Sequence, residues 1–464
     1  MNDNLEVIIL AAGLGTRMKS ATIKILHHAA GRPIIDYVLD LAAELSPAPP
    51  VMVVGYQRDA VQEAIGSRAR FAVQDQQLGT GHAVLQAAPL LEADGGSAKR
   101  ILILSGDVPL TRPETLRQLL DEHERSGNAL TLLTMKLDQP AMYGRIVRDA
   151  DGAVVRIVEA KDASEEEKQI GEVNAGIYVF GGEHLFDNLR NLSNENAQGE
   201  YYLTDLLAVL REGGHRVGAV VAHDPVEALG VNSRGELAQV ESEIQRRVVR
   251  NLMAEGVTFR NPATVVIDST VTIGADSVVY PFVTLEGATR IGQGCLIEPG
   301  VHLVNVTVGA NVHLKTGTVA EDAIIEDDAT VGPYAHLRPG TQLGRHVKIG
   351  NFVETKKAVF GEGAKASHLS YIGDAEIGAD VNIGAGTITC NYDGVNKHKT
   401  VLEDGVFIGS DTQLVAPVRV GRGAYVGAGS TITKDVPADA LALSRTPQRI
   451  VAGWAARKKE SREK

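Results

Sequence analysis

Aliphatic residues recur at every sixth position between Val265 and Ile432, and glycine commonly follows them. Two runs keep the interval strictly: Val331, Leu337, Leu343 and Ile349, and then Ile408, Leu414, Val420, Val426 and Ile432. This period is neither helical nor that of a simple strand, so it indicates an architecture of its own. Hexapeptide repeats wind into a parallel β-helix, where aliphatic side chains fill a narrow prism and glycines suit the tight corners. A β-sandwich is the alternative, but its turns come at less regular spacings of roughly 8–12 residues.

The length and charge of the chain narrow the remaining choices. A chain of 464 residues is too long for one compact core and predicts two or three domains. Its 46 basic and 58 acidic residues give a net charge of −12, which argues against non-specific nucleic-acid binding. Any anionic ligand must therefore be bound by local positive sites. We see no charged-then-apolar leader and no apolar run long enough to span a bilayer, so we expect no membrane insertion.

The two cysteines, Cys295 and Cys390, lie far apart in the sequence and in no spacing typical of metal ligands. The simplest interpretation is a reducing, cytoplasmic compartment. We expect both cysteines to be small core residues.

A glycine-rich turn follows the first predicted strand, residues 7–10. The turn reads Ala11-Ala12-Gly13-Leu14-Gly15-Thr16-Arg17-Met18, and Lys24 comes shortly after it. A buried strand that opens into such a turn places backbone N–H groups against a phosphate. Arg17 and Lys24 supply the positive charge that a triphosphate needs in an acidic protein. The alternative is a tight turn with solvated basic residues.

Further strands are predicted at residues 51–54 and 101–104, with helices at 33–44 and 58–64. This alternation predicts a mostly parallel sheet with helices on both faces and ligands beyond the carboxyl ends of the strands. Asp107 follows one such end and is a natural ligand for Mg²⁺, which prefers oxygen ligands and bridges to substrate phosphates. An aspartate that only caps a helix or turn is the alternative.

Polar loops lie between and after these strands. Residues 74–82 contain Gln74, whose amide together with loop backbone groups can match the one donor and two acceptors of uracil. Gly144, Glu159 and Asn174 lie in later loops of the kind that bind sugar hydroxyls. Taken singly, each is more often a surface polar residue, and only their joint order favours a site.

These motifs, in this order and followed by a hexapeptide domain, resemble one bacterial family over nearly the whole chain. It is the family of bifunctional N-acetylglucosamine-1-phosphate uridyltransferases/glucosamine-1-phosphate acetyltransferases. The amino-terminal motifs are shared with other sugar-nucleotide pyrophosphorylases, so they indicate the reaction type better than the substrate. The resemblance implies an α/β fold, with a Rossmann-like nucleotidyltransferase domain followed by a left-handed parallel β-helix.

The resemblance also implies the residues of the uridyltransferase site. UTP would be bound by Leu10, Ala11, Ala12, Gly13, Lys24, Gln74, Gly79, Thr80 and Asp107. The acetylated sugar phosphate would be bound by Gly144, Glu159, Asn174 and Asn232, and Mg²⁺ by Asp107 and Asn232. Arg17 and Lys24 would be catalytic, because two anions must meet in line while pyrophosphate leaves. Two residues depart from the family: Ile23 where proline is common, and Leu14 where lysine is frequent.

The strongest break in the hexapeptide pattern runs from Gly350 to Lys399, and its polar insert, 390–399, interrupts the hexads. Since a β-helix alone is a scaffold, function is expected where the repeat breaks. The resemblance implies His368 as general base, and Arg338, Lys356, Tyr371 and Asn382 around glucosamine-1-phosphate. Acetyl-CoA would lie along Ala385, Asn391, Tyr392, Ser410, Ala428 and Arg445, with Asn391 also near the sugar. A histidine is suited to take a proton from the amine that attacks the thioester, and Ser410 or a backbone N–H to stabilise the oxyanion.

The predicted domains are a uridyltransferase domain at 1–232, a linker helix at 233–255, a β-helix acetyltransferase domain at 256–440 and a tail at 441–464. Left-handed hexapeptide prisms associate as trimers, so we expect a homotrimer. The basic tail is either a solvated terminus or, through Arg457 and Lys459, a contact to CoA phosphates.

We therefore predict a cytoplasmic enzyme that acetylates glucosamine-1-phosphate and then couples the product to UTP, giving UDP-N-acetylglucosamine for cell-envelope synthesis. The expected ligands are Mg²⁺, UTP, acetyl-CoA and the two sugar phosphates. One rival is a single-activity nucleotidyltransferase whose β-helix only oligomerises the chain. The other is a non-catalytic regulatory subunit of the same architecture, against which Arg17, Lys24 and Asp107 speak.

Overall fold

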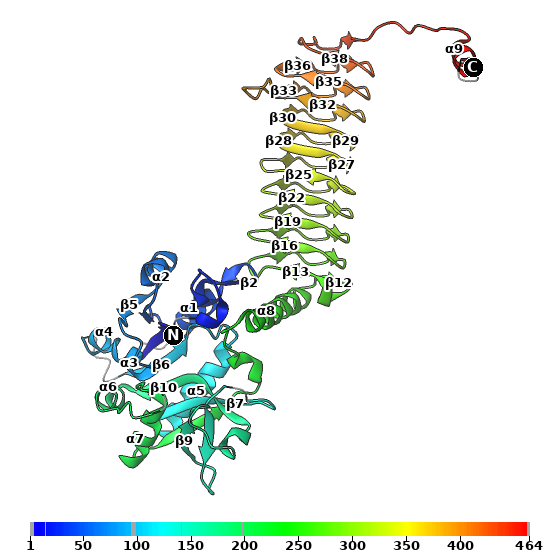
Figure 1. Cartoon of the computed structure of the whole chain (residues 1–464). Coiled ribbons are helices and arrows are strands. Elements are labelled where there is room, and N and C mark those ends of the chain that lie inside the picture. The colour runs from blue at the N-terminus through cyan, green and yellow to red at the C-terminus, as the bar shows by residue number, and fades with distance from the viewer. Residues whose placement is uncertain (1–3, 14, 94–98, 141, 197, 462–464) are drawn as a thin grey trace. The chain divides into compact units, whose positions relative to one another are not determined.

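The computed structural model describes residues 4–13, 15–93, 99–140, 142–196 and 198–461. The chain divides between Ile244 and Gln245 into two compact units (Figure 1). The first is an α/β unit and the second a β-helix, and each is described by itself below.

A mixed sheet forms the centre of the first unit, in the order β11-β7-β10-β6-β1-β4-β5, with β8 paired to β10 and β9 paired to β8. Its strands are β1 (Leu5–Ala11), β4 (Val51–Val54), β5 (Arg70–Val73), β6 (Arg100–Ser105), β7 (Leu130–Lys136), β8 (Arg145–Arg148), β9 (Val154–Val158), β10 (Glu172–Gly181) and β11 (Val217–Val221). The prediction of a mostly parallel sheet holds from β6 to β5 and is wrong for β10, which runs antiparallel to both β6 and β7.

Helices cover both faces of this sheet because successive residues of β1 point to opposite sides. Ile9 packs into a core with α1 (Ile34–Leu45), α2 (Arg58–Ile65) and α5 (Pro113–Ser126). Ile8 packs into a second core, on the other face. The helices of that face are α3 (Thr80–Leu85), α4 (Ala88–Ala93), α6 (Phe186–Arg190) and α7 (Leu206–Glu212).

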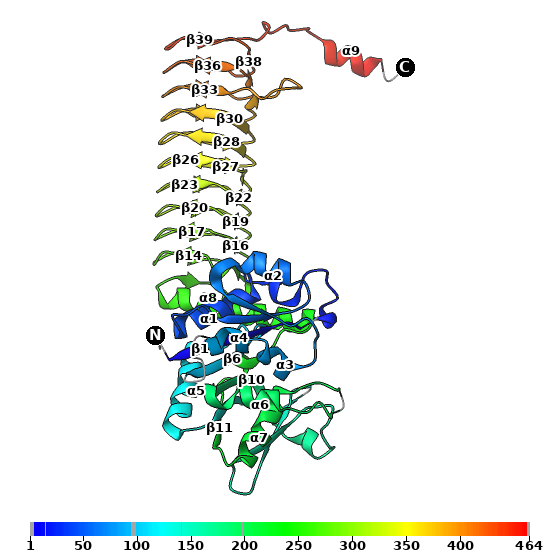
Figure 2. The same ribbon diagram turned by 90° about the vertical axis from the view of Figure 1, so that its left-hand side faces the viewer.

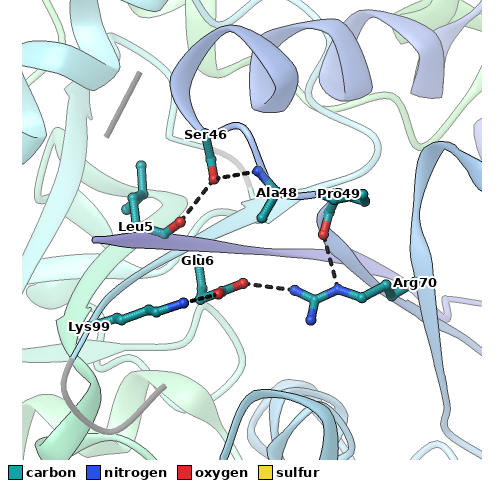
Figure 3. Close-up of polar contacts among 7 residues, drawn as sticks. All are labelled: Leu5, Glu6, Ser46, Ala48, Pro49, Arg70 and Lys99. Atoms are coloured by element: carbon teal, nitrogen blue, oxygen red, sulfur yellow. Dashed lines mark hydrogen bonds and ion pairs between the residues drawn. The ribbon is translucent and has the colours of Figure 1, made fainter. Parts of the chain in front are cut away.

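A buried carboxylate on β1 links β5 and the segment before β6, at the end of the sheet where β1 begins (Figure 3). Glu6 on β1 is only 3% exposed, and it accepts hydrogen bonds of 2.7 Å from Arg70 on β5 and from Lys99, which precedes β6. The Arg70 Nε also donates to the carbonyl of Pro49. Because a buried charge without a partner is costly, this double ion pair is expected to stabilise the register of the strands.

The helix α8 (Arg234–Ala254) lies where the sequence predicts a helix from 233 to about 256. It begins with a variant of the capping box: the Glu236 N–H donates to the Ser233 hydroxyl, and the Glu236 carboxylate accepts from the N–H of Asn232, the residue before Ser233. Towards its end, Val249 and Leu252 join the core of the second unit.

The second unit is a β-helix whose strands stack as parallel layers (Figure 2). Pairs such as Leu296 with His313 and Thr330 with Lys348 lie 17 and 18 residues apart, which is three hexapeptides per coil. An 11-stranded sheet contains β12 (Thr258–Phe259), β15 (Val278–Val279), β18 (Leu296–Ile297), β21 (His313–Leu314), β24 (Thr330–Val331), β27 (Lys348–Asn351), β29 (Lys365–His368), β31 (Asn382–Ile383), β34 (Phe407–Ile408), β37 (Tyr425–Val426) and β39 (Leu441–Ala442).

A 17-stranded sheet supplies the other faces of the prism. It contains β13 (Val266–Ile267), β14 (Thr272–Ile273), β16 (Thr284–Glu286), β17 (Arg290–Ile291), β19 (His302–Val304), β20 (Thr307–Val308), β22 (Val319–Glu321), β23 (Ile324–Ile325), β25 (His336–Leu337), β26 (Gln342–Leu343), β28 (Glu354–Phe360), β30 (Tyr371–Ile377), β32 (Ile388–Cys390), β33 (Thr400–Leu402), β35 (Gln413–Val415), β36 (Val418–Val420) and β38 (Thr431–Ile432). The short helix α9 (Trp454–Glu460) follows in the tail.

The hexapeptide prediction is confirmed by burial. All residues of the two runs that keep the six-residue interval strictly are buried in a single core. A Cβ on Gly409 would lie 2.5 Å from the backbone nitrogen of Ala428 in the next coil, so only glycine fits that corner. The expectation for the cysteines is half right, because Cys295 is buried and Cys390 only half-buried. Among the described residues, no helix has the length and apolar character needed to cross a membrane.

Candidate active sites

A cavity of about 380 Å³ opens in the first unit, beside the carboxyl ends of β1 and β6. All nine residues that the sequence assigns to UTP line it: Leu10, Ala11, Ala12, Gly13, Lys24, Gln74, Gly79, Thr80 and Asp107. Ile25, Gln77, Ala83, Ser105 and Glu200 also line it and were not predicted. A larger, shallow hollow of about 730 Å³ lies between α5 and β11, but no predicted motif lines it and its charged residues are largely paired with one another.

The glycine-rich turn brings Lys24 to this cavity. Gly15 has a φ of +60°, and a Cβ there would lie 2.9 Å from the Cβ of Lys24, so both its backbone and its close contact require glycine. Ile23 has a φ of −60°, the value that a proline would impose, and its side chain is buried. The departure at Ile23 therefore leaves the approach of Lys24 intact. Leu14 lies outside the described residues.

Lys24 meets two oxygens from distant segments of the chain. Its Nζ forms an ion pair with Asp107 Oδ2 and donates a 3.0 Å hydrogen bond to Asn232 Oδ1. The two oxygens thus converge on one cation, which is the arrangement that a Mg²⁺ ion would need. Among the described residues no group of three or more metal-binding side chains occurs, and two oxygens suit Mg²⁺, which keeps waters and substrate phosphates in its shell. Arg17 is exposed on the 3₁₀ turn Thr16–Met18, whose Met18 is buried, and it does not line the cavity.

Three of the four predicted sugar-phosphate residues lie together. The Asn174 N–H donates to the Gly144 carbonyl at 2.9 Å, and a Cβ on Gly144 would lie 3.5 Å from a carboxylate oxygen of Glu159. Burial raises the pKa of Glu159, whose carboxylate accepts a hydrogen bond from Thr204. A register shift in β10 follows Asn174 and is the kind of irregularity that re-aims a side chain at a site. Asn232, the fourth residue, lies with Lys24 and Asp107.

Successive coils of the β-helix place four of the predicted acetyltransferase residues, His368, Ala385, Ser410 and Ala428, in one column. Asn351 pairs with His368, and the pairing registers of the following strands continue the column through Ala385, Ser410 and Ala428. Arg445 closes it, since its Nη1 donates to the Ala428 carbonyl at 2.7 Å. The side chains of Ser410 and Arg445 are exposed. A long ligand such as acetyl-CoA could extend along such a column.

His368 is oriented by a residue that the sequence did not assign. Its Nδ1 lies 2.6 Å from Asn351 Oδ1. Because an amide oxygen can only accept, Nδ1 carries the hydrogen and Nε2 keeps its lone pair. His368 is exposed, so that lone pair is available as a base. The 17-residue offset between the two residues, equal to one coil, is the signal that could have found Asn351.

Cations cluster on the face that β25, β28 and β30 form. Arg338 forms a 2.8 Å ion pair with Glu354, and Lys356 lies one coil further along. Lys397, from the polar insert, lies beside Lys356 and lowers its pKa by hydrogen bonding and charge repulsion, with Arg338 adding to the repulsion. Such a cluster of like charges favours a bound dianion. Lys397 is a second residue that the sequence analysis missed.

The remaining predicted residues lie on both sheets of the β-helix and in the insert. Tyr371 begins β30, and Asn382 begins β31 on the other sheet. Asn391 Nδ2 donates to Asp374, and the Tyr392 hydroxyl donates to the Gly394 carbonyl within the insert. Gly373 leaves space for the side chains of Tyr371 and Asn391, because a Cβ on Gly373 would lie 2.4 Å from the Tyr371 hydroxyl and 2.9 Å from Asn391 Nδ2.

These features define the class of protein: a nucleotidyltransferase joined to a hexapeptide-repeat transferase. Residues 6–225 match the family model for nucleotidyl transferases, and residues 322–357 and 399–434 match that for bacterial transferase hexapeptide repeats. Three full-length relatives carry the name bifunctional protein GlmU. They come from Pelobacter propionicus (52% identical over 99% of both chains), Syntrophotalea carbinolica (55% over 98% of this chain and 97% of the relative) and Geobacter sulfurreducens (49% over 99% and 100%). The chain belongs to the GlmU family of bifunctional uridyltransferase–acetyltransferases.

Proposed function

We propose that this chain acetylates glucosamine-1-phosphate with acetyl-CoA and then transfers uridylate from UTP to the product, giving UDP-N-acetylglucosamine and pyrophosphate. One observation carries the proposal furthest. Lys24, Asp107 and Asn232 come from three distant segments, yet they meet at one point of a cavity lined by all nine residues assigned to UTP. The proposed role in cell-envelope precursor synthesis comes with the family to which the chain belongs.

In the uridyltransferase site, an oxygen of the sugar phosphate attacks the α-phosphorus of UTP and pyrophosphate leaves. Lys24 and Arg17 neutralise the phosphates, while Gly144, Glu159 and Asn174 hold the sugar in line. Mg²⁺, bound by Asp107 and Asn232, would supply further charge neutralisation. Lys24 contacts both of those residues, so Mg²⁺ at that place would require Lys24 to move, and the triphosphate would offer it a new partner.

In the acetyltransferase site, the amine of glucosamine-1-phosphate attacks the thioester carbonyl, the C–S bond breaks and CoA leaves as the thiol. His368 Nε2 takes the proton that the amine must lose. The Ser410 hydroxyl, in the same column, can donate to the oxyanion of the intermediate. Arg338, Lys356 and Lys397 bind the phosphate, and binding of that dianion relieves the repulsion between the two lysines.

The domain assignment, quaternary structure and location are also proposals. We propose that residues 1–232 carry uridyl transfer and residues 256–440 acetyl transfer, joined by a linker helix at 233–255. A homotrimer is supported by the hexapeptide fold and by the insert 390–399, which projects from its coil (Figure 2). A cytoplasmic location is supported by the unpaired state of both cysteines.

A paired assay on the purified chain tests the two activities. Free CoA thiol is followed with glucosamine-1-phosphate and acetyl-CoA, and pyrophosphate with N-acetylglucosamine-1-phosphate, UTP and Mg²⁺. The wild-type chain should give both signals, and His368→Ala should abolish only thiol release. Pyrophosphate release without thiol release from the wild-type chain would favour the single-activity nucleotidyltransferase. The absence of both signals would favour the non-catalytic regulatory subunit.

A further inference from the structure

The side chain of Gln74 is held in one orientation by two contacts. It is only 3% exposed, and its Nε2 donates to the Gly79 carbonyl at 3.1 Å and lies 3.0 Å from Nδ1 of His82. A carbonyl oxygen can only accept, so the NH₂ group of the amide must face Gly79 and His82. Among the described residues, no group donates a hydrogen bond to Gln74 Oε1. This oxygen is not among the fully buried side-chain atoms that lack a partner, so it is not sealed off in the interior. Oε1 is therefore open to a ligand in the cavity that Gln74 lines.

The tautomer of His82 decides whether that orientation is stable. Nδ1 must accept the second N–H of Gln74, which requires the hydrogen of the neutral ring to be on Nε2. The opposite tautomer would point an N–H at the Gln74 NH₂ group and would favour a turned amide, at the cost of the bond to Gly79.

Gln86 competes for the same ring. Its Nε2 donates to the His82 carbonyl at 3.0 Å and lies 3.2 Å from His82 Nε2. A neutral imidazole can accept only one hydrogen bond at its ring nitrogens, so it cannot serve both amides. The contact to Gln74 is shorter and comes from the more buried side chain, and Gln86 retains its bond to the carbonyl.

The loop that holds this pair is itself fixed. The Gly81 N–H donates to the Tyr201 carbonyl at 2.8 Å, and the Tyr201 N–H donates to the Leu78 carbonyl at 2.8 Å. A Cβ on Gly79, whose φ is +105°, would lie 2.6 Å from the Tyr201 carbonyl oxygen. Because the backbone around Gly79 and His82 cannot shift freely, their contacts set the position of the Gln74 amide.

We propose that His82 is a positioning residue that selects uracil over cytosine by holding the Gln74 carbonyl oxygen towards the base. Uracil has an N–H at position 3, which Oε1 can accept, whereas cytosine has a lone pair there that would face the same oxygen. This inference deepens the proposed uridyltransferase function and rests on it. It assigns to His82 a role in substrate choice rather than in the chemical step.

Three variants of the full-length chain test it: His82→Leu, which removes the acceptor; His82→Asn, whose Oδ1 can stand where Nδ1 does; and His82→Gln, whose longer amide reaches past that position. Pyrophosphate release is measured against UTP and CTP with saturating sugar phosphate and Mg²⁺. For Leu and Gln we expect KM for UTP to rise about 10-fold with kcat nearly unchanged, and the UTP-to-CTP ratio of kcat/KM to fall about 10-fold. Asn should restore both within about threefold of wild type.

Unchanged KM and UTP-to-CTP ratio in the Leu and Gln variants would overturn the inference. So would a loss of kcat that Asn does not rescue, because a structural role alone would have that effect. Thiol release from the same samples reports whether each variant is folded; if Leu fails to fold, Gln and Asn still decide the matter. Gln74→Ala distinguishes the proposed uracil contact of Gln74 from the proposed role of His82. No rise in the KM of this variant for UTP would refute the uracil contact itself. A rise in this variant, without an effect in the His82 variants, would refute only the role of His82.

Discussion

The two units assemble their sites in different ways. In the α/β unit, Lys24 contacts residues 83 and 208 positions away, which meet only because the sheet brings separate strand ends together. In the β-helix, His368 contacts Asn351, 17 positions away, and the same corner repeats in the next coils. A globular site therefore depends on the whole topology, whereas a repeat site depends mainly on the length of a coil.

The two sites also differ in the charges that surround their lysines. In the α/β unit, Lys24 is paired with Asp107 and hydrogen-bonded to Asn232, so cation and anion satisfy each other. In the β-helix, Lys356 lies beside another lysine, which lowers its pKa. Under the proposed function, binding of Mg²⁺ and a triphosphate would require Lys24 to exchange partners, whereas the second site already presents neighbouring positive charges.

The largest expected effect comes from breaking the exchange in the first site. Asp107→Asn keeps the shape of the side chain but removes the charge that would bind Mg²⁺ and release Lys24. We expect uridyl transfer to fall about 10³-fold, which corresponds to about 4 kcal/mol. Pyrophosphate release measures it, and thiol release from the same sample should be unchanged. A parallel loss of acetylation would indicate misfolding and would contradict the separation of the two sites.

The sequence alone predicts different parts of the two sites, for physical reasons. The residues 10–13 are contiguous with a buried strand, so their place at its carboxyl end could be predicted. The meeting of Asp107 with Asn232 came only with the family resemblance, because it depends on sheet order, and the antiparallel direction of β10 was missed for the same reason.

In the β-helix, coil length could have predicted the step from His368 to Ala385 and the step from Ser410 to Ala428, but not the 25-residue step between Ala385 and Ser410, which spans the insert. The approach of Lys397 to Lys356 could not be predicted, because Lys397 lies in an insert that leaves the repeat. Ala375 pairs with Thr400, 25 residues on, in place of the usual 17 or 18.

A second prediction compares ion pairs in the two units. Glu6→Ala leaves Arg70 and Lys99, which are about three-quarters buried, without their buried partner. We expect a loss of about 3 kcal/mol in the free energy of unfolding of the first unit. Thermal inactivation of uridyl transfer should shift down by roughly 6–12 °C.

The matched control is His302→Ala in the β-helix. His302 pairs with Glu286 at 2.6 Å, but both side chains are more than 40% exposed. An exposed pair contributes less than about 1 kcal/mol, so acetyl transfer should keep its inactivation temperature. Equal shifts for the two variants would contradict the idea that burial, rather than pairing, makes Glu6 important.

A third prediction concerns the orientation of His368. Asn351→Ala removes the acceptor at Nδ1, so the ring can rotate or adopt the tautomer whose Nε2 is not a base. We expect kcat of acetyl transfer to fall about 100-fold, or about 2.7 kcal/mol. Asn351→Asp keeps an oxygen acceptor and should stay within about tenfold of wild type. Equal losses in both variants, measured by thiol release, would show that Asn351 acts through packing and not through the hydrogen bond.

The smallest expected effect is a pH dependence confined to the α/β unit. Among the described residues the two buried histidines, His27 and His123, both belong to it. Burial, with the nearby Arg100 charge, lowers the pKa of His123 to about 4, and its Nδ1 lies 3.0 Å from the Thr131 hydroxyl. The unfolded chain takes up this proton near pH 6.5 and the folded chain only near pH 4. Between those values the unfolded state binds more protons, so stability is full above about pH 6.5 and decreases as the pH falls.

By pH 5 the expected loss from His123 is about 2 kcal/mol. Denaturant unfolding followed through uridyl transfer should show this slope, and the slope should flatten in His123→Asn, whose amide can still bond Thr131 without titrating in this range. Acetyl transfer should show no such slope, because the described residues of the β-helix include no buried histidine. A parallel decrease from pH 6.5 to pH 5 in the free energies of unfolding followed through the two activities would show that the two units unfold together. The difference between the two kinds of site would then not extend to the stability of the units.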